Sequence, residues 1–300
     1  MLEIYAYNAG KGDCLRIHYA ETHNIFVDTG VTRFAPRFKQ ICEEIIGHDE
    51  TLDALLLTHV DDDHIGGVLA NLRFSDYVCP FKEIWMNHDG DGFVGDTNLS
   101  TRQNDEVYAR LLQRGITVRA MRTGVLHTAA GATIEIVWPE VLSRDQSRVD
   151  TLLAHHNDYR IPLSTLADMP IAVHDVSMNN KNSIVFTFSY EGKRLLLTGD
   201  AWAEDVVKAT GNYDLVKLPH HGSVRNISDA FPAAIRSNYF LICTDGRDHP
   251  DKQTIAKLEK WYGEINVYSP VAWWDHGYFQ PGDKEHKINY QKKEGLVIAW

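Results

Sequence analysis

Cysteine is scarce in this sequence, and no two of the four cysteines are close enough to form a CxxC pair. The absence of such pairs excludes a zinc ribbon and argues against a disulfide scaffold. No apolar run approaches the ~18 residues that a membrane helix requires, and the first residues show no signal-peptide pattern. The formal net charge of −11 argues against a broad nucleic-acid-binding face. We therefore expect an acidic cytoplasmic protein without a membrane contact.

Hydrophobic patterning predicts strands and helices along the whole chain. Strands are expected at 2–6, 15–19, 24–28, 52–58, 83–87, 133–138, 183–190, 194–198, 215–218, 239–243 and 265–269. Helices are expected around 38–45, 100–115, 203–210, 229–235 and 251–262. This order predicts one α/β domain over 1–300, with sheets in the middle and helices outside. Residues 139–178 are polar and are predicted to be an insertion near the active site, with a short helix near 149–156.

Histidine and aspartate are concentrated in residues 58–67, which read Thr-His-Val-Asp-Asp-Asp-His-Ile-Gly-Gly. The segment follows a predicted buried strand and precedes a helix, so we expect a strand-to-helix loop. Alternate side chains on this loop direct His59 and Asp61 to one metal ion, and Asp63 and His64 to a second. The plainer interpretation makes Asp63 a helix cap and the histidines surface residues. The pattern is rare by chance at this composition, which favours the metal interpretation.

Two further segments place an acid or histidines at the ends of predicted strands. Asp200 follows three leucines and Thr-Gly, at the strand end where open α/β folds bind ligands. Alone it would more often be a helix N-cap, but beside the motif at 58–67 it becomes a candidate metal ligand. His220 and His221 precede Gly-Ser at another strand end, where one can bind a metal ion while the other hydrogen-bonds substrate or a ligand. Ser223 is a candidate contact in the same turn.

The order of these motifs resembles that of the metallo-β-lactamase-fold hydrolases. The residues that carry the resemblance are HxDxDH at 59–64, Thr-Gly-Asp at 198–200 and His-His-Gly-Ser at 220–223, with Gly-Lys-Gly-Asp-Cys at 10–14 and Phe-Val-Asp-Thr-Gly at 26–30. More narrowly, the sequence is similar to the hydrolase domain of the competence protein ComEC and its stand-alone relatives. The resemblance implies a four-layer αβ/βα sandwich with two divalent metal ions. It assigns the ions to His59, Asp61, Asp63, His64, Asp200 and His220 or His221, and puts Asp28 behind these ligands.

The sequence departs from the wider superfamily at two ligand positions. Asp61 stands where most members have histidine, as in the ComEC-like branch. A histidine expected before the Thr-Gly-Asp motif is replaced by an Asn-rich segment, in which Asn180 and Asn182 are candidate contacts to ligands or substrate. His174 is an alternative replacement. Because the first site is then rich in oxygen ligands, Mn²⁺ fits it as well as Zn²⁺.

Other candidates rest on weaker signals. His249 precedes a proline where relatives carry Gly-His-Pro, and is a candidate substrate contact or a surface histidine. His88 follows a predicted strand. His155, His156 and Arg160 lie in the insertion, where phosphate binding competes with a solvated loop. An aromatic cluster at 273–279 is suited to stacking on bases, but such clusters more often pack on the core.

We predict a dinuclear hydrolase that acts on a phosphodiester, either nucleic acid or a small nucleotide-like ester. Asp63, Asp200 and His249 are the candidate catalytic residues. Two alternatives remain: hydrolysis of a carbon-centred ester, thioester or amide, and a binding module that has lost catalysis. The sequence does not reveal which partner proteins, if any, the chain binds.

Overall fold

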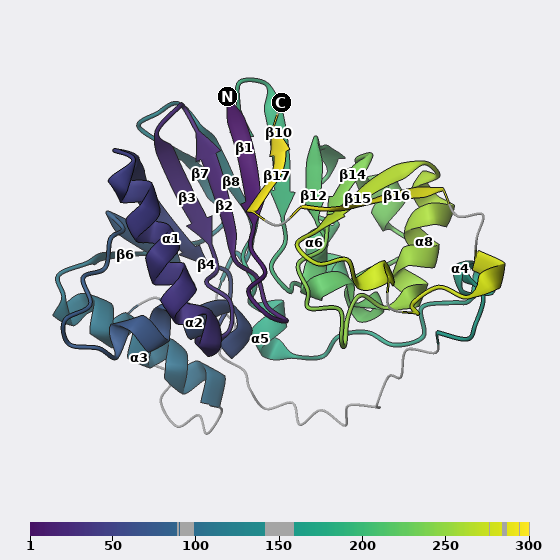
Figure 1. Cartoon of the computed structure of the whole chain (residues 1–300), viewed down its shortest axis with the longest axis horizontal. Helices are drawn as coiled ribbons and strands as arrows, with labels where there is room; N and C mark the ends of the chain where they lie inside the picture. The colour runs from purple at the N-terminus through teal and green to yellow at the C-terminus, as the bar shows by residue number, and fades with distance from the viewer. Residues whose placement is uncertain are drawn as a thin grey trace.

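The fold is built around two β-sheets in the computed structural model, which describes residues 1–88, 90, 99–141, 159–275, 277–283, 287–293 and 295–299. Within these residues the first sheet has the order β17-β1-β2-β3-β4-β5-β6, and the second has the order β16-β15-β14-β12-β10-β9-β8-β7 (Figure 1). Strands of the first sheet are β1 (Leu2–Ala6), β2 (Leu15–Tyr19), β3 (His23–Val27), β4 (Thr51–Leu57), β5 (Glu83–Met86), β6 (Thr117–Ala120) and β17 (Gly295–Ala299).

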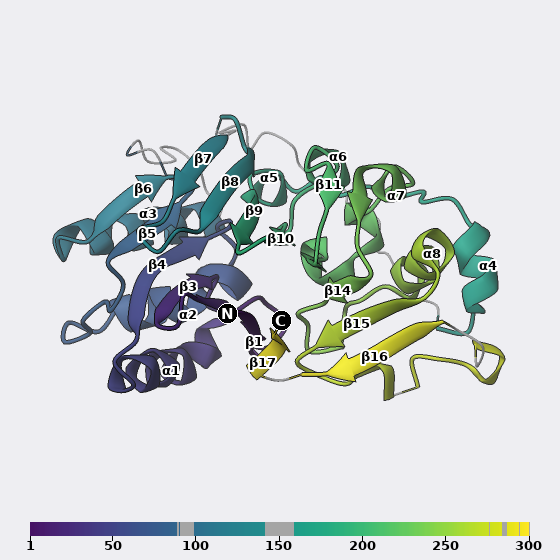
Figure 2. The same ribbon diagram turned by 90° about the horizontal axis from the view of Figure 1, so that it is seen from above.

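The second sheet draws its strands from the middle and later parts of the chain. They are β7 (Gly124–His127), β8 (Thr133–Trp138), β9 (Val185–Tyr190), β10 (Lys193–Leu197), β12 (Leu215–Lys217), β14 (Tyr239–Leu241), β15 (Ile265–Ser269) and β16 (Ile288–Lys292). Short strands β11 (Gly211–Asn212) and β13 (Ile235–Arg236) pair with each other. β17 pairs antiparallel with β1, so the two ends of the described chain lie together (Figure 2).

Helices cover the outer face of each sheet. On the first sheet lie α1 (Ala35–Gly47), α2 (Asp62–Leu72) and α3 (Leu99–Gln113). On the second lie α4 (Leu163–Asp168), α6 (Ala203–Val206), α7 (Phe231–Ala234) and α8 (Lys252–Tyr262). A further short helix, α5 (Met178–Lys181), lies at the edge where the two sheets meet. The expected four-layer αβ/βα sandwich is confirmed.

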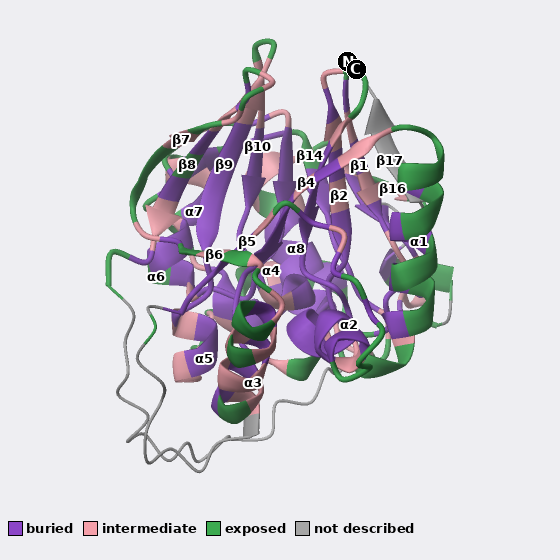
Figure 3. Ribbon diagram, turned by 90° about the vertical axis from the view of Figure 1, so that its left-hand side faces the viewer, coloured by how far each residue is buried: buried purple, intermediate pink, exposed green. Residues whose placement is uncertain are grey.

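Side-chain periodicity explains which faces meet. Leu15, Ile17 and Tyr19 alternate along β2 and point into an apolar core between the sheets. In α1, Phe38 and Ile41 are among the buried residues at helical spacing, so this helix packs on the sheet through one face. Most strands are accordingly buried, while α1 and α3 expose one face (Figure 3). No helix within the described residues is both long and apolar enough to span a membrane.

Several predicted elements differ in extent. The helices expected at 203–210 and 229–235 are limited to α6 and α7. The helix expected near 149–156 lies outside the described residues. Within the predicted insertion, α4 packs on α8 at the outer face of the second sheet. The predicted Asn-rich segment forms α5, whose first backbone groups are capped by Ser177.

Candidate metal centre

One carboxylate oxygen lies at the meeting point of four imidazole rings. Asp200, directly after β10, places its Oδ2 atom 3.9 Å from Nε2 of His59, 3.3 Å from Nε2 of His64, 3.8 Å from Nε2 of His220 and 3.4 Å from Nε2 of His221. His59 and His64 come from the loop and helix after β4, and the paired histidines come from the turn after β12. The structure thus brings three distant segments together at one edge of the sandwich.

Two further aspartates complete this cluster. Asp61 Oδ2 lies 3.7 Å from Nε2 of His59, and Asp63 Oδ2 lies 3.8 Å from Nε2 of His221. Asp61 is the more exposed of the two carboxylates. Nitrogen and carboxylate oxygen donors in this mixture suit Zn²⁺ or Mn²⁺.

The histidine-aspartate motif is not wholly a loop, contrary to the prediction. Asp61 has extended backbone at the N-cap of α2, and the helix begins at Asp62, so Asp63 and His64 lie in its first turn. α2 fits closely against the segment after β3: a Cβ atom on Gly67 would lie 2.2 Å from the carbonyl oxygen of Thr29. Only glycine permits that approach, which fixes the start of α2 beside the site.

Consecutive left-handed residues aim both rings of the His-His pair at Asp200. His220 has φ 46° and His221 has φ 54°, a conformation that costs about 1–3 kcal/mol per non-glycine residue. The turn is held by the His220 N–H, which donates to the Gly199 carbonyl at 3.1 Å. Sequence alone left open which histidine reaches the centre, and the structure brings both to it.

Hydrogen-bond acceptors on the outer side of two rings determine which nitrogen carries the proton. Nδ1 of His64 lies 2.8 Å from Asp28 Oδ2, and Nδ1 of His221 lies 3.0 Å from the carbonyl oxygen of Cys243. Because these oxygens only accept, each Nδ1 carries a proton, and Nε2 is the nitrogen of each ring that can bind a cation once it is deprotonated. Asp28 is fixed by Thr58, whose N–H and hydroxyl both donate to it.

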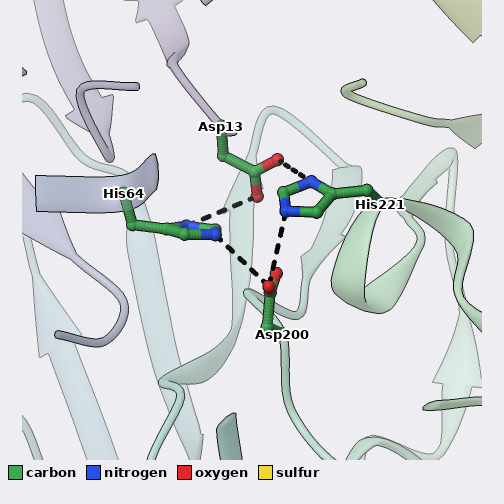
Figure 4. Close-up of side chains that lie close together, drawn as sticks. All are labelled: Asp13, His64, Asp200 and His221. Atoms are coloured by element: carbon green, nitrogen blue, oxygen red, sulfur yellow. Dashed lines mark ion pairs between the residues drawn. The ribbon is translucent and has the colours of Figure 1, made fainter. Parts of the chain in front are cut away.

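A buried ion pair lies behind the same rings and was missed by sequence reasoning. Asp13 Oδ1 lies 3.2 Å from Nδ1 of His221, and Asp13 Oδ2 pairs with the ammonium of Lys217 (Figure 4 shows Asp13 with the rings). Lys217 Nζ also lies 3.7 Å from Asp200 Oδ1. Asp13 contacts Nδ1 of His221 and can orient this ring, and it also offers an oxygen within 4.8 Å of ligand atoms of His64, Asp200 and His221. The signal available in the sequence was a lysine inside a buried strand.

A polar network also surrounds the outer side of His220. Its Nδ1 lies 3.3 Å from Asp175 Oδ2 and 3.0 Å from Asn226 Oδ1. Asn180, a predicted contact residue, donates to Asp175 at 2.7 Å, and Asn226 donates to the same carboxylate at 2.7 Å. Asp175 and Asn226 therefore orient His220, and neither was singled out from the sequence.

The other residues of the Asn-rich segment and the His-His turn have different positions from those expected. Asn179, not Asn182, reaches a candidate ligand, because its amide donates to Asp61 Oδ1 at 2.7 Å. Asn182 lies at the end of α5, where its carbonyl accepts from Asn87. Ser223 caps the next turn by accepting from the Arg225 N–H.

Weaker candidates from the sequence lie away from the centre. His174 is exposed and borders a surface cavity of about 430 Å³, so it does not take the place of the missing histidine. His88 stacks on Tyr108 and pairs with Asp105 at 3.0 Å. Arg160 is exposed, and His155 and His156 lie outside the described residues. Trp273 and its aromatic neighbours in the described residues pack on one another in the apolar core between the second sheet and its helices.

His249 lies beside the centre, with its ring centroid 5.2 Å from that of His220. Burial and the neighbouring imidazole of His220 lower the pKa of His249 to about 4. The ring is therefore neutral at pH 7 and offers one N–H donor and one acceptor, not a positive charge.

Unpaired buried atoms indicate that this cluster fits a cation. Among the described residues, Nε2 of His59, His64 and His221 and Oδ1 of Asp200 are buried without a hydrogen-bond partner. Burial raises the pKa of Asp200, but the surrounding imidazoles outweigh it and hold this pKa well below its usual range. A divalent cation would stabilise this ionised carboxylate in place of the protons on the surrounding imidazoles, and these donor atoms are suited to bind one.

Comparisons with known proteins agree with the architecture. A model of the metallo-β-lactamase superfamily matches residues 8–75. The crystal structure of Zn²⁺-bound PqqB from Methylobacterium extorquens is 11% identical, with a TM-score of 0.50, and the alignment covers 99% of this chain and 100% of that chain. The metallo-β-lactamase fold protein YhfI from Bacillus subtilis is 12% identical, with a TM-score of 0.46 over 99% and 98% of the two chains. A diphosphatase from the PhnP family is 10% identical, with a TM-score of 0.46 over 100% and 98%.

No curated protein matches the sequence. The family model and the structural likeness to PqqB show that this chain has the metallo-β-lactamase fold.

Proposed function

We propose that this protein is a dinuclear metal-dependent hydrolase of phosphodiesters, with Zn²⁺ or Mn²⁺ as the two ions. The observation that carries the proposal is the convergence of four Nε2 atoms on Asp200 Oδ2 at 3.3–3.9 Å. A small nucleotide-like ester and nucleic acid are both substrates of this chemical class.

The donors divide into two groups that share Asp200. One ion would be held by His59, Asp61 and His220, and the other by Asp63, His64 and His221. In the first group His220 supplies the nitrogen that the Asn-rich segment lacks, and Asn179 orients Asp61. The outer contacts from Asp28 and Asp13 fix the rings of the second group.

Divalent cations bound here would lower the pKa of a water molecule and offset charge on a phosphoryl group. Residues of the chain support this chemistry. Asp200 stays ionised at neutral pH, and the Asp63 carboxylate lies beside the ring of His221 in the same cluster. His249 borders that space as a neutral ring, so it can donate an N–H to a leaving oxygen. The similarity of the motifs to ComEC-like hydrolases supports a phosphodiester over a carbon-centred substrate.

Substitution of the shared carboxylate tests the metal assignment. Asp200→Ala should abolish both the binding of Mn²⁺ or Zn²⁺, measured by elemental analysis, and hydrolysis of bis-nitrophenyl phosphate. Asp229→Asn is a matched control, because Asp229 is an exposed carboxylate that pairs with Lys257. Full metal occupancy and activity in Asp200→Ala would refute the assignment.

A substrate panel tests the reaction. The metal-loaded protein should hydrolyse bis-nitrophenyl phosphate faster than nitrophenyl acetate or a chromogenic lactam. The reverse order would support the carbon-centred alternative, and fewer than one bound ion after metal supplementation would support a binding module.

A further inference from the structure

A lysine stands over the candidate metal centre on the loop between β1 and β2. Lys11 Nζ lies 3.3 Å from Asp63 Oδ2, while 60% of the Lys11 side chain is exposed to solvent. Its ammonium is therefore at the solvent side of the cluster, in contact with a candidate ligand.

The backbone of the loop is fixed against α2. A Cβ atom on Gly12 would lie 1.7 Å from the carbonyl oxygen of Asp63, a distance that no other residue could accommodate without moving the loop. The next residue, Asp13, is anchored by its buried pair with Lys217. Lys11 is thus carried on a fixed backbone, although its own side chain reaches into solvent.

Lys11 and Lys217 both face candidate ligands but differ in what encloses them. The Lys217 ammonium is buried, pairs with Asp13 and donates to the Gly199 carbonyl at 2.9 Å, so its bonds are taken up inside the protein. The Lys11 ammonium instead pairs with the Asp63 carboxylate, which is also a candidate ligand of a bound cation. When a divalent ion takes that charge, the exposed ammonium is free to pair with another anion at the same opening.

We propose that Lys11 binds a phosphoryl oxygen of the substrate and gives this site its preference for anionic over neutral esters. This inference rests on the proposed function, because it assumes cations at Asp63 and a substrate that carries negative charge. Lys11 then acts in binding, next to the reacting group, and competes with the metal ion for Asp63 while no substrate is present.

Removal of the Lys11 charge should weaken phosphate binding but should not weaken metal binding, whereas loss of a structural residue would weaken both. In Lys11→Met, binding of inorganic phosphate to the Mn²⁺-loaded protein should weaken by roughly 10- to 100-fold, the loss expected for a charge-assisted hydrogen bond. The KM for bis-nitrophenyl phosphate should rise by a similar factor with little change in kcat. Affinity for Mn²⁺ should stay equal or increase, because a competing positive charge has gone.

Two variants complete the experiment. Lys11→Arg should restore most of the phosphate affinity, because it restores the charge. Lys39→Met is the matched control, an exposed lysine on α1 that pairs with Glu43. Hydrolysis of nitrophenyl acetate, a neutral ester, should fall much less in Lys11→Met than hydrolysis of bis-nitrophenyl phosphate does.

Two results would overturn the proposal: unchanged phosphate affinity in Lys11→Met, or a parallel loss of Mn²⁺ and phosphate affinity, as expected of a structural residue. These outcomes are distinguishable from failure of the proposed function. Absence of phosphodiester hydrolysis by the unsubstituted protein would refute the function, whereas the phosphate titration tests Lys11 without turnover.

Discussion

A buried ion pair far along the chain from the candidate ligands offers a sharp test of the packing. Lys252 on α8 and Asp283 lie 2.6 Å apart, with 0% and 1% of their side chains exposed. The ammonium also donates to the carbonyls of Tyr159 and Ile161, both at 2.8 Å, and Asp283 accepts from the Leu163 N–H at 2.7 Å. The pair therefore fastens α8 to the segment that leads into α4.

Lys252→Met should lower the free energy of unfolding by about 3–5 kcal/mol, because it leaves the Asp283 carboxylate buried without its countercharge. Lys260→Met on the same helix is the matched control: Lys260 pairs with Asp168 at 2.9 Å, but the side chains are 49% and 79% exposed. Loss of that pair should cost only about 0–1 kcal/mol. Urea unfolding followed by tryptophan fluorescence measures both changes.

The sign of the pH dependence follows from Asp283. Burial raises the pKa of this carboxyl, but Lys252 and the N–H groups of Leu163 and Gln280 outweigh it, so the folded-state pKa lies below the usual value. The stabilisation is present above the unfolded-state pKa of about 3.9 and is lost as pH falls through the folded-state value. The difference between Lys252→Met and the unsubstituted protein should therefore shrink in acid.

The double variant Lys252→Met/Asp283→Asn should recover part of the lost stability, because no charge is then left buried alone. Equal losses in Lys252→Met and Lys260→Met, or no recovery in the double variant, would refute this reasoning.

Three further changes test other contacts. Gly67→Ala should destabilise the protein by about 1–3 kcal/mol in thermal unfolding because of its contact with the preceding loop, whereas Gly47→Ala, with no atom within 4 Å of the added Cβ, should be neutral or slightly stabilising. Asp175→Asn should weaken Mn²⁺ binding by about 10-fold in a metal titration by loosening His220; unchanged affinity would contradict that role. Hydrogen bonds from two arginines lower the pKa of Glu106 to about 2. Glu106→Gln should therefore lower the free energy of unfolding by about 1 kcal/mol near neutral pH, and by less as pH falls from about 4 towards 2. A loss of stability that does not depend on pH would argue against the ion pair.

The candidate ligands were predictable because they lie next to strands that the sequence marks clearly. Leu55, Leu56 and Leu57 precede the first motif, and three leucines precede Asp200, so both motifs fall at strand ends. Strand ends at one sheet edge come close in space whatever their separation along the chain. The convergence of these groups therefore follows from local patterns.

The residues behind the ligands were not predictable in the same way. Asp13 and Lys217 become partners only because the sheets pack face to face, and no local spacing encodes that contact. Asp175 was passed over for its neighbour His174, since a histidine was the residue type expected there. The segment's geometry puts the carboxylate against His220 and leaves His174 exposed.

Strands with little buried surface also escaped prediction. β6 and β7 lie at the free edges of their sheets, and most of their residues are exposed. Edge strands lack the clear alternation that marks a half-buried strand, so hydrophobic patterning does not separate them from loops. The helix start at Asp62 was missed because three successive aspartates carry no apolar period.

Asp200 and the His-His turn extend from one sheet, whereas the motif after β4 extends from the other. Divalent ions held between them would link the two sheets at the edge of the sandwich where the site lies. Removal of the ions by a chelator would leave each sheet packed against its own helices. The acidic side chains at this edge would then repel one another, because no cation would offset their charge. Opening should begin there, well before the outer layers separate.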